Sequence, residues 1–403
     1  MREGWKEVKL GEILEIKHGY GFKGEYFTDE KTEDILVTPG NFHIGGVFKG
    51  DKLKFYKGPV NENFVLKEND VVVTMTDLSK MADTIGFSAK IPAKSDQRYL
   101  HNQRIGLVSL LDESFDLNFI YWLLRTNSYQ RYIAGSAIGA TVKHTSPSKI
   151  YTAKVIVPEN KETQRKIASI LSGYDDLIEN NLKRIKILEE MAQQTYEEWF
   201  VRMRFPGFET AKIDEVTGLP EGWEKVKLGD VCELVMGQSP KSEHYNDEGN
   251  GLPFHQGVKD YGFRFPINNS WSTAGNKKAI PNSILFSVRA PVGRLNVAAE
   301  EIIFGRGLSA INHKKGLNSF LYYQLRKIFF EDNLIGGGAI YASVTKNDVE
   351  RIEIVSADKH SEHFNNYASL IDKEILNLTN QNQRLREARD LLLPRLMMGI
   401  VEV

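Results

Sequence analysis

Two long stretches of the chain carry apolar residues at helical spacing. In 162–200 and again in 359–393, the apolar positions alternate three and four residues apart, a pattern typical of a coiled-coil seam. The first seam comprises Leu171, Tyr174, Ile178, Asn181, Ile185, Leu188, Ala192, Thr195 and Trp199. The second comprises Tyr367, Ile371, Glu374, Leu378, Gln381, Leu385, Ala388 and Leu392. These seams predict two long helices, the first capped by Asn160 and the second limited by Pro394.

The two predicted helices match each other in length and in polar seam position. At 1.5 Å per residue they would be about 58 and 52 Å long. Asn181 and Gln381 stand at matching seam positions, and polar seam residues fix the register of a coiled coil. This match favours a mutual antiparallel pair, which would place two globular segments at opposite ends of a rod. Two separate amphipathic helices, each packed on its own globular domain, are the alternative.

The segments outside the helices repeat one another. Residues 4–16 recur as 222–234 with seven of 13 positions identical, and residues 137–142 recur as 339–344. A short alternating strand, 153–157 or 351–355, leads into each helix. The chain is therefore predicted to be an α+β protein with an internal pseudo-two-fold repeat. Two similar globular domains, 1–158 and 207–356, would be joined by helical segments 159–206 and 357–403 that form an antiparallel coiled-coil rod.

The composition narrows the class of protein. No apolar run reaches the roughly 18 residues of a membrane span, and the first residues lack the apolar core of a signal peptide. The single cysteine, Cys232, excludes an internal disulfide and a cysteine-based zinc cluster. We therefore expect a cytoplasmic protein without a membrane partner.

Motifs for catalysis are missing from the sequence. Residues 19–24 fit the dinucleotide pattern G-x-G-x-x-G, but no clear βαβ unit surrounds them and the equivalent residues 237–241 lose the pattern. A turn is the preferred interpretation. The sequence has neither a phosphate-binding loop nor the catalytic loop of an amino-methyltransferase. We therefore expect no catalytic residue, no metal site and no cofactor on this chain.

The overall charge argues against nucleic-acid binding, but its distribution argues for it. The chain holds 52 basic and 53 acidic residues. Residues 254–327, however, hold eleven basic and three acidic residues, an excess of eight positive charges. Basic residues interleaved with aromatic and amide side chains suit a surface that follows phosphates and reads base edges. An ordinary solvated basic face is the alternative.

Ordered motifs along nearly the whole chain resemble the specificity subunit of type I restriction–modification systems. These motifs are 219–223 with 226–230, 139–143 with 146–150, 155–158 with 162–171, and the closing 391–399. Within the variable domains, 74–77 with 102–106 is similar to one known recognition-domain type, and 287–293 with 305–307 to another. Residues 358–363 depart from the pattern that precedes the first helix, which leaves the start of the second helix open.

The resemblance implies a non-catalytic subunit that binds double-stranded DNA. Each recognition domain would read one half of a bipartite asymmetric site. The helices would set the half-site spacing and dock two modification subunits, which use S-adenosylmethionine to methylate adenine at N6. Two restriction subunits, where present, would add ATP- and Mg-dependent activity. A scaffold with two protein-binding domains on a coiled-coil rod is the alternative.

Sixteen residues are predicted to contact DNA. In the first domain they are Thr76, Asp77, Lys80, Asn102, Gln103, Arg104 and Lys143. In the second they are Gln238, Ser239, Lys241, Gln256, Lys259, Arg289, Arg294, Arg306 and Lys346.

Overall fold

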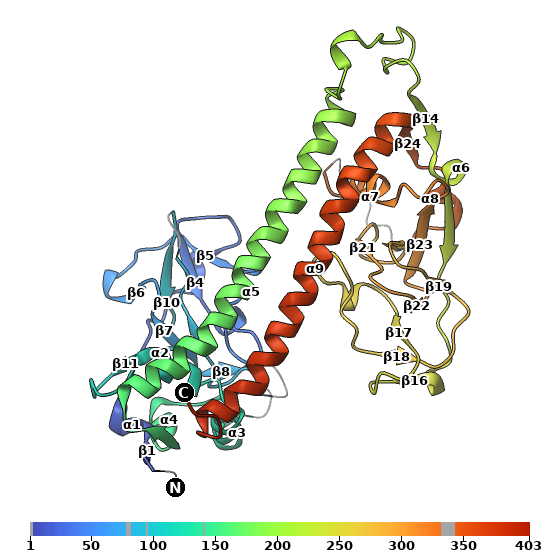
Figure 1. Cartoon of the computed structure of the whole chain (residues 1–403). Helices are drawn as coiled ribbons and strands as arrows, with labels where there is room; N and C mark the ends of the chain where they lie inside the picture. The colour runs from blue at the N-terminus through green and yellow to red at the C-terminus, as the bar shows by residue number, and fades with distance from the viewer. Residues whose placement is uncertain (1–2, 78–81, 94–95, 140–141, 332–342) are drawn as a thin grey trace. The chain divides into compact units, whose positions relative to one another are not determined.

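The chain folds into two compact units, each containing part of both long helices (Figure 1). The computed structural model describes residues 3–77, 82–93, 96–139, 142–331 and 343–403. Unit 1 comprises Met1–Ile178 and Arg384–Val403, and unit 2 comprises Glu179–Gln383. The predicted boundaries give each helix a segment of its own, whereas the compact units divide both helices between them.

Unit 1 is built on two main sheets. Its strands are β1 (Trp5–Lys9), β2 (Leu14–His18), β3 (Phe27–Thr28), β4 (Asp34–Val37), β5 (Lys54–Tyr56), β6 (Val65–Leu66), β7 (Val71–Thr74), β8 (Thr76–Asp77), β9 (Ser88–Lys90), β10 (Arg98–His101), β11 (Ile105–Leu110), β12 (Lys143–His144) and β13 (Lys154–Pro158). One sheet has the order β3-β5-β4-β10-β6 and the other β2-β11-β7-β9, while β1 pairs with β13 and β8 with β12. Its shorter helices are α1 (Leu10–Ile13), α2 (Leu117–Leu123), α3 (Asn127–Ser136) and α4 (Pro147–Tyr151).

Unit 2 repeats both main sheets and the pair β1-β13 of this topology, but its described residues form no named strands matching β8 and β12. Its strands are β14 (Glu224–Lys227), β15 (Cys232–Met236), β16 (Tyr245–Asn246), β17 (Leu252–His255), β18 (Trp271–Ser272), β19 (Lys278–Ala279), β20 (Ile284–Ser287), β21 (Leu295–Val297), β22 (Ile302–Phe304), β23 (Leu308–His313) and β24 (Glu353–Ser356). The sheet orders are β16-β18-β17-β22-β19, β15-β23-β20-β21 and β14-β24. Helices α6 (Leu228–Val231), α7 (Asn318–Arg326) and α8 (Lys346–Glu350) correspond to α1, α2 and α4. The internal repeat predicted from residues 4–16 and 222–234 is confirmed. The second predicted match, between 137–142 and 339–344, includes 140–141 and 339–342, which lie outside the described residues.

The two long helices form where the seams predict them. Helix α5 (Lys161–Tyr196) continues as a π-helical turn over Glu197–Val201, and α9 spans Asp358–Met397. The Asn160 cap is confirmed, because the Asn160 side chain accepts a hydrogen bond from the Glu162 backbone at 2.8 Å. The expectation that Pro394 limits the second helix is wrong, since the helix continues to Met397. Leu396 and Met397 are buried in the core of unit 1, and their packing holds the last turn despite the hydrogen bond that proline removes.

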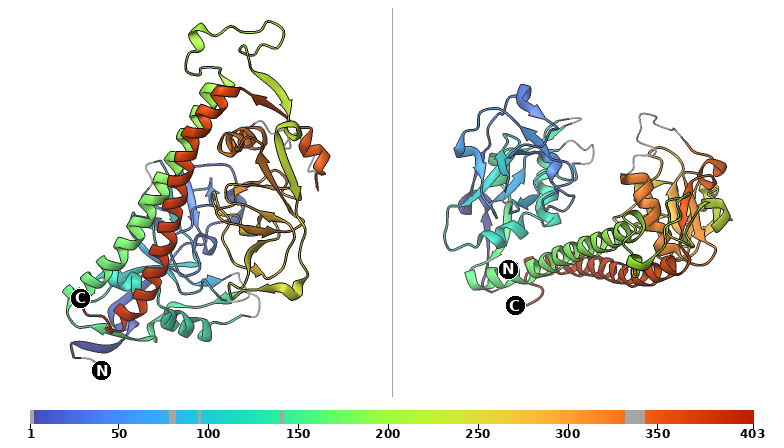
Figure 2. Two further views of the ribbon diagram at one scale, coloured as in Figure 1. Left: turned by 45° about the vertical axis from the view of Figure 1, so that its right-hand side comes forward. Right: turned by 90° about the horizontal axis from the view of Figure 1, so that it is seen from above.

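Within unit 2 the helices α5 and α9 run side by side in antiparallel directions (Figures 1 and 2). Arg184 on α5 forms an ion pair with Glu374 on α9 at 2.9 Å. Further along α9, Asn382 lies opposite Asn181 of α5. The Asn181 side-chain amide donates to the Asn382 side chain at 3.0 Å and to Gln381 at 3.4 Å. Asn382 is 2% exposed, whereas Gln381 is exposed. Gln381 therefore contacts Asn181 of the other helix as predicted, but the buried partner of Asn181 is the next residue, Asn382.

Each unit has a core shared between its sheets and the helices. In unit 1 the core runs from Leu10 and Trp122 to Leu171 on α5 and Leu396 on α9. In unit 2 it includes Tyr196, Phe200 and Phe364, whose rings contact one another. A helix face that packs on a sheet is wider than a coiled-coil seam. Among the described residues, no helix is long and apolar enough to span a membrane.

Candidate nucleic-acid interface

One short loop occupies the same place in both units. In unit 1 it connects β10, which pairs in parallel with β4, to β11 in the middle of the four-stranded sheet. In unit 2 it connects β22, which pairs in parallel with β17, to β23 in the middle of the equivalent sheet. In unit 1 this reading loop is 102–104, and in unit 2 it is 305–307. In both, its last residue accepts a backbone hydrogen bond, from Met75 to Arg104 at 2.9 Å and from Val288 to Gly307 at 3.0 Å.

Glycines let a second segment approach each reading loop closely. The Tyr20 backbone donates to His101 at 2.8 Å and accepts from Gln103 at 3.0 Å. A Cβ on Gly19 would lie 2.3 Å from the Asn102 carbonyl oxygen, and one on Gly237 would lie 2.1 Å from that of Gly305. Close backbone approach therefore accounts for the first glycine of the 19–24 pattern, at a position repeated in unit 2.

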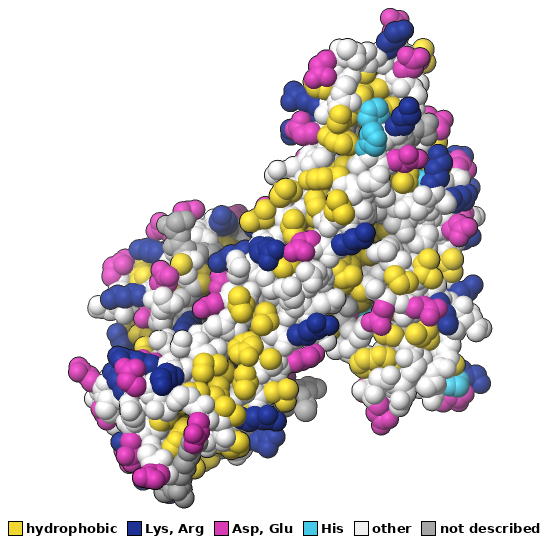
Figure 3. Space-filling model, viewed as in Figure 1, with side chains coloured by type: hydrophobic (Ala, Val, Ile, Leu, Met, Phe, Trp, Pro, Cys, Tyr) yellow, Lys and Arg dark blue, Asp and Glu magenta, His cyan; other side chains and the backbone are white. Residues whose placement is uncertain are grey.

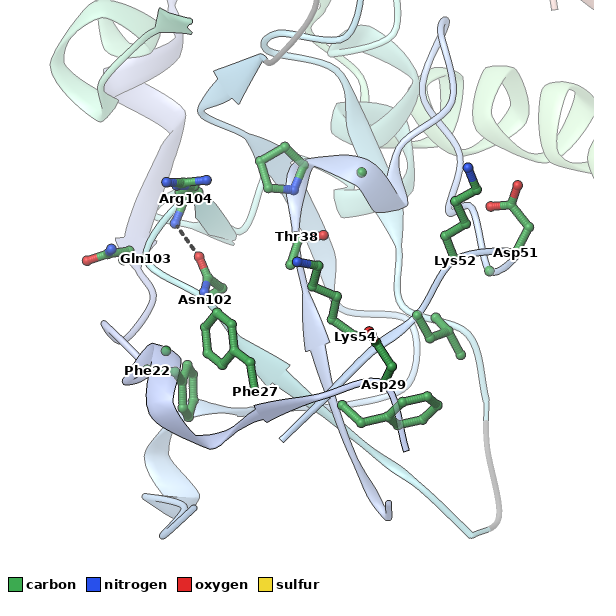
Figure 4. A pocket seen from close by; sticks show the side chains of 16 residues that line it. Phe22, Phe27, Asp29, Thr38, Asp51, Lys52, Lys54, Asn102, Gln103 and Arg104 are labelled. Atoms are coloured by element: carbon green, nitrogen blue, oxygen red, sulfur yellow. Dashed lines mark hydrogen bonds between the residues drawn. The ribbon is translucent and has the colours of Figure 1, made fainter. Parts of the chain in front are cut away.

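Two hollows flank the reading loop of unit 1. The larger, of about 990 Å³, is a groove lined by Phe22, Phe27, Thr38, Lys54 and the reading loop, among others (Figure 4). The smaller, of about 470 Å³, is lined by His18, Thr76, His144 and their neighbours. Gln103 and Arg104 line both hollows and are exposed. Both predicted residues therefore stand where a ligand in either hollow would meet them.

The other predicted residues of unit 1 are less accessible. Asn102 is 8% exposed, and its side-chain oxygen accepts a hydrogen bond from the Arg104 backbone at 3.1 Å. Lys143 is half-buried on β12, opposite Asp77. Lys80 lies outside the described residues.

Thr76 and Asp77 are buried, at 3% and 1% exposed. One carboxylate oxygen of Asp77 accepts from the Thr84 backbone at 2.6 Å, from the Thr84 hydroxyl at 2.7 Å and from the Ile85 backbone at 3.0 Å. Thr76 shares a hydrogen bond of 3.2 Å with His144. Asp77, next to Thr76 in the smaller hollow, therefore holds residues 84–85, and the sequence alone did not distinguish this supporting role from contact with a ligand.

Unit 2 gathers four predicted residues around its reading loop. The Ser239 hydroxyl donates to the Gln256 side chain at 2.8 Å, and the Arg306 backbone donates to that hydroxyl at 3.4 Å. Gln238 joins them through a backbone hydrogen bond to Phe304 at 3.1 Å. Gln238, Gln256 and Arg306 are exposed, so this cluster presents two amides and a guanidinium to solvent.

The remaining predicted residues of unit 2 are exposed at separate turns. Arg289 follows β20, next to the residue that donates to Gly307. Arg294 lies between β20 and β21, Lys241 lies 3.8 Å from Glu243, and Lys346 lies 3.4 Å from Glu350 on α8. Lys259 stands on the short 3-10 helix η7 (Val258–Asp260), which corresponds to η2 (Pro39–Asn41) in unit 1.

The charge count over residues 254–327 overstates the surface charge of unit 2. Arg264 is 2% exposed and pairs with Glu189 and Asp372, and Arg326 also pairs with Glu189. Lys278 lies 3.4 Å from Glu301. Part of the predicted basic patch is therefore neutralised, and two of its arginines bind the long helices.

Sequence reasoning missed Thr38, Phe22 and Phe27 in the groove. Thr38 follows β4 as Gln256 follows β17, so the internal repeat could have identified it. A further repeat also went unnoticed, because residues 119–125 match 320–326 at four of seven positions.

Comparison with known proteins agrees with this repeated arrangement. The family described as type I restriction modification DNA specificity domain matches residues 2–190 and 220–356. A putative type I restriction enzyme MjaX specificity subunit from Methanocaldococcus jannaschii is 33% identical over 63% of this chain, a match that spans 61% of that relative's length. The type I restriction enzyme HindI specificity subunit from Haemophilus influenzae is 25% identical over 70% of this chain and 76% of its own length.

A solved structure supports the fold. The type I restriction–modification S subunit from M. genitalium superposes with a TM-score of 0.60 at 19% identity, covering 97% of this chain and 96% of that one. The two matched segments of the family each contain one reading loop, and together they cover most of the sequence. The chain therefore belongs to the family of type I restriction–modification DNA specificity subunits.

Proposed function

We propose that this chain is the non-catalytic subunit that selects a bipartite DNA sequence, each unit reading one half. The observation that carries the proposal is the reading loop, which stands at the same place of the same topology in both units but bears different side chains. Gln103 and Arg104 line a groove in unit 1, and Arg306 stands beside Gln238 and Gln256 in unit 2. One scaffold with two reading surfaces suits an asymmetric target.

These side chains have the chemistry of direct readout. Arginine can grip guanine through two hydrogen bonds, and glutamine can do the same with adenine. We assign base contacts to Gln103, Arg104, Gln238, Gln256 and Arg306. Lysines near the loops, among them Lys54, Lys143 and Lys259, suit phosphate contacts, which position a protein without reading sequence. We do not assign a DNA contact to Asp77, because it is buried and accepts hydrogen bonds from Thr84 and Ile85.

The long helices would serve as a spacer and as a docking surface for partners. We propose that α5 and α9 pair as an antiparallel coiled-coil rod that fixes the distance between the two half-sites. Apolar side chains appear along the helices in the space-filling view (Figure 3). On α5, Ile170 and Leu177 in unit 1 and Leu182, Ile187 and Met191 in unit 2 are 40–55% exposed. Two modification subunits would cover such positions and supply S-adenosylmethionine and adenine-N6 methylation. Restriction subunits, where present, would supply ATP- and Mg-dependent activity.

Co-expression with a cognate modification subunit, followed by genome-wide mapping of methylated adenine, tests the proposal. We expect one bipartite methylated motif. Arg306→Ala should relax a single base position within one half by about 1–3 kcal/mol, and Gln103→Ala should relax a position within the other half. Absence of any bipartite motif would overturn the proposal. Binding of the assembled complex to duplex DNA should also weaken steeply with salt, whereas a protein scaffold would show no such dependence.

A further inference from the structure

A buried arginine in each unit joins the globular part to the long helices. In unit 1 this residue is Arg125, which follows α2 and is 5% exposed. Its guanidinium donates to Asp175 on α5 at 2.9 Å, to the Gly45 carbonyl oxygen at 2.9 Å and to the Tyr121 hydroxyl at 2.8 Å. It also lies 4.1 Å from the ring centroid of Trp122. Arg125 therefore connects α5, α2 and the loop after η2.

In unit 2 the corresponding residue is Arg264, between η7 and β18, which is 2% exposed. It donates to Glu189 on α5 at 3.1 Å and to Asp372 on α9. Its guanidinium lies 3.3 Å from the ring centroid of Tyr322 on α7. Arg264 thus contacts both long helices and one helix of the globular part.

The two networks are equivalent in position but not in sequence. Asp175 is the fifteenth residue of α5 and Asp372 the fifteenth residue of α9, so the acids occupy matching places in the repeat. Both long helices also join each network, because Asp175 accepts from Arg389 on α9 in unit 1 and Glu189 binds Arg264 in unit 2. The residue that matches Arg125 by sequence is Arg326, which binds Glu189 instead. Each unit therefore connects its globular part to the long helices through a buried arginine, but the two arginines stand at different places in the repeat.

A buried ion pair is a weak source of net stability, because its members lose their hydration. It is a strong source of geometry, since a guanidinium held between carboxylates and above a ring has a single low-energy placement. In unit 2 Arg264 fixes the globular part, and with it the reading loop, against two helices at once. In unit 1 Arg125 does so against α5.

We infer that Arg125 and Arg264 are positioning residues that hold each reading loop in a fixed orientation on the helices and so restrict the half-site spacing. This inference rests on the proposed function. DNA rises 3.4 Å per base pair, so a reading loop free to shift by that distance would accept sites one base pair longer or shorter. The half-site sequences themselves should not change, because neither arginine belongs to a reading loop.

The test compares Arg264→Met with wild type in the assembled modification complex, by methylation mapping. Sites with the correct halves but a spacer altered by one base pair should gain methylation about tenfold relative to wild type, which corresponds to about 1.4 kcal/mol of lost discrimination. Arg184→Met is the matched control. Arg184 joins α5 to α9 through Glu374 at 2.9 Å, but its side chain is half exposed, and removing this pair should leave the spacing unchanged.

The outcomes separate the inference from the proposed function. Loss of any bipartite motif in wild type overturns the proposed function. A wild-type motif of one spacing, with the same single spacing in folded Arg264→Met, overturns only the inference. If Arg264→Met does not fold, the same methylation mapping of Arg264→Lys tests the inference. Lysine keeps the charge but lacks the planar fork that reaches two acids, so altered spacers should still gain methylation, and an unchanged spacing overturns the inference.

Discussion

The reading loops of units 1 and 2 share a backbone arrangement but differ in what surrounds them. In unit 1 the residue after the parallel strand is Thr38, and an open groove of about 990 Å³ lies between it and the loop. In unit 2 that residue is Gln256, and a Cβ on Gly305 or Gly307 would lie 2.6 Å from its atoms. The Gln256 side-chain amide therefore lies against the loop, whereas Thr38 lines the groove at the equivalent place in unit 1. The shared topology therefore places the loop, and the residue that follows β4 or β17 differs between the two units.

The largest effect is expected from substitutions that prevent the close backbone approach of Gly19 or Gly237 to the reading loop of its unit. Gly19→Val would place a side chain 2.3 Å from a backbone oxygen that cannot rotate away. We expect a loss of about 3 kcal/mol or more in the free energy of unfolding of unit 1, measured by denaturant titration, together with loss of the methylated motif. Gly237→Val should have the same effect in unit 2.

Gly24→Val is the control for both variants. A Cβ on Gly24 would meet no atom of the described residues within 4 Å, so the free energy of unfolding should stay near that of wild type. Equal destabilisation by Gly24→Val and Gly19→Val would show that any branched side chain in this segment disrupts the fold, and the proposed role of the close contact would be wrong.

The next comparison sets Asp77 against Arg289, since each follows the equivalent strand of its unit. Asp77→Ala removes the acceptor of three hydrogen bonds from Thr84 and Ile85. The free energy of unfolding should fall by about 1–3 kcal/mol, because a buried backbone donor is left unpaired. Arg289→Ala should change it by no more than about 0.5 kcal/mol, since the side chain is exposed.

Thermal unfolding of both purified variants checks this pair, and methylation mapping supplies the second readout. Arg289→Ala should weaken or relax recognition without unfolding. If Asp77→Ala kept the full stability of wild type and relaxed the methylated motif at one base position, Asp77 would be assigned a DNA contact after all.

A smaller effect is expected where the sequence and the structure disagree about α9. Asn382→Ala removes the partner of the buried Asn181 amide, at a cost of about 1 kcal/mol. The cost stays modest because the Asn382 amide nitrogen is itself buried and has no hydrogen-bond partner among the residues that the structure describes. Gln381→Ala should be neutral in denaturant titration, since its side chain is exposed. A larger loss from Gln381→Ala than from Asn382→Ala would show that Gln381, and not Asn382, is the main partner of Asn181.

The sequence predicted what depends on local pattern. Residues 4–16 and 222–234 identified the repeat, and the seams identified α5 and α9 to within a few residues. It failed where long-range packing decides. Gln381 and Asn382 are equally polar, and only the structure shows that the second is buried opposite Asn181 while the first is exposed. Helix α9 continues past Pro394 because Leu396 and Met397 enter a core built from distant residues.

The candidate site divides in the same way. Gln103, Arg104 and Arg306 were predicted and are exposed beside or within the reading loops. Asp77 was predicted to contact DNA and Arg264 was counted in the basic stretch 254–327, because a sequence does not show which way a side chain points. Arg264 forms ion pairs with Glu189 and Asp372. Asp77 accepts hydrogen bonds from Thr84 and Ile85. Such assignments need the partners, which lie up to 108 residues away along the chain.

The smallest expected effect is an absence of reaction at Cys232. This residue occupies in β15 the place of Leu14 in β2, and it is 4% exposed. Burial raises the pKa of its thiol to about 12, against a value near 8.5 in an unfolded chain. The folded state therefore keeps the neutral thiol at pH 8. The associated stability is lost only as the pH rises above about 8.5 and on toward 12, where the unfolded chain ionises first.

Thiol reactivity consequently reports on unit 2 alone, because the chain holds a single cysteine. At pH 8, a thiol-specific chromogenic disulfide should react far more slowly with the folded protein than with the denatured chain. If the two units unfold separately, Gly237→Val should expose the thiol while Gly19→Val leaves it protected. Equal reaction rates in both variants would mean that the units unfold as one. A folded wild type that reacts as fast as the denatured chain would contradict the burial of Cys232.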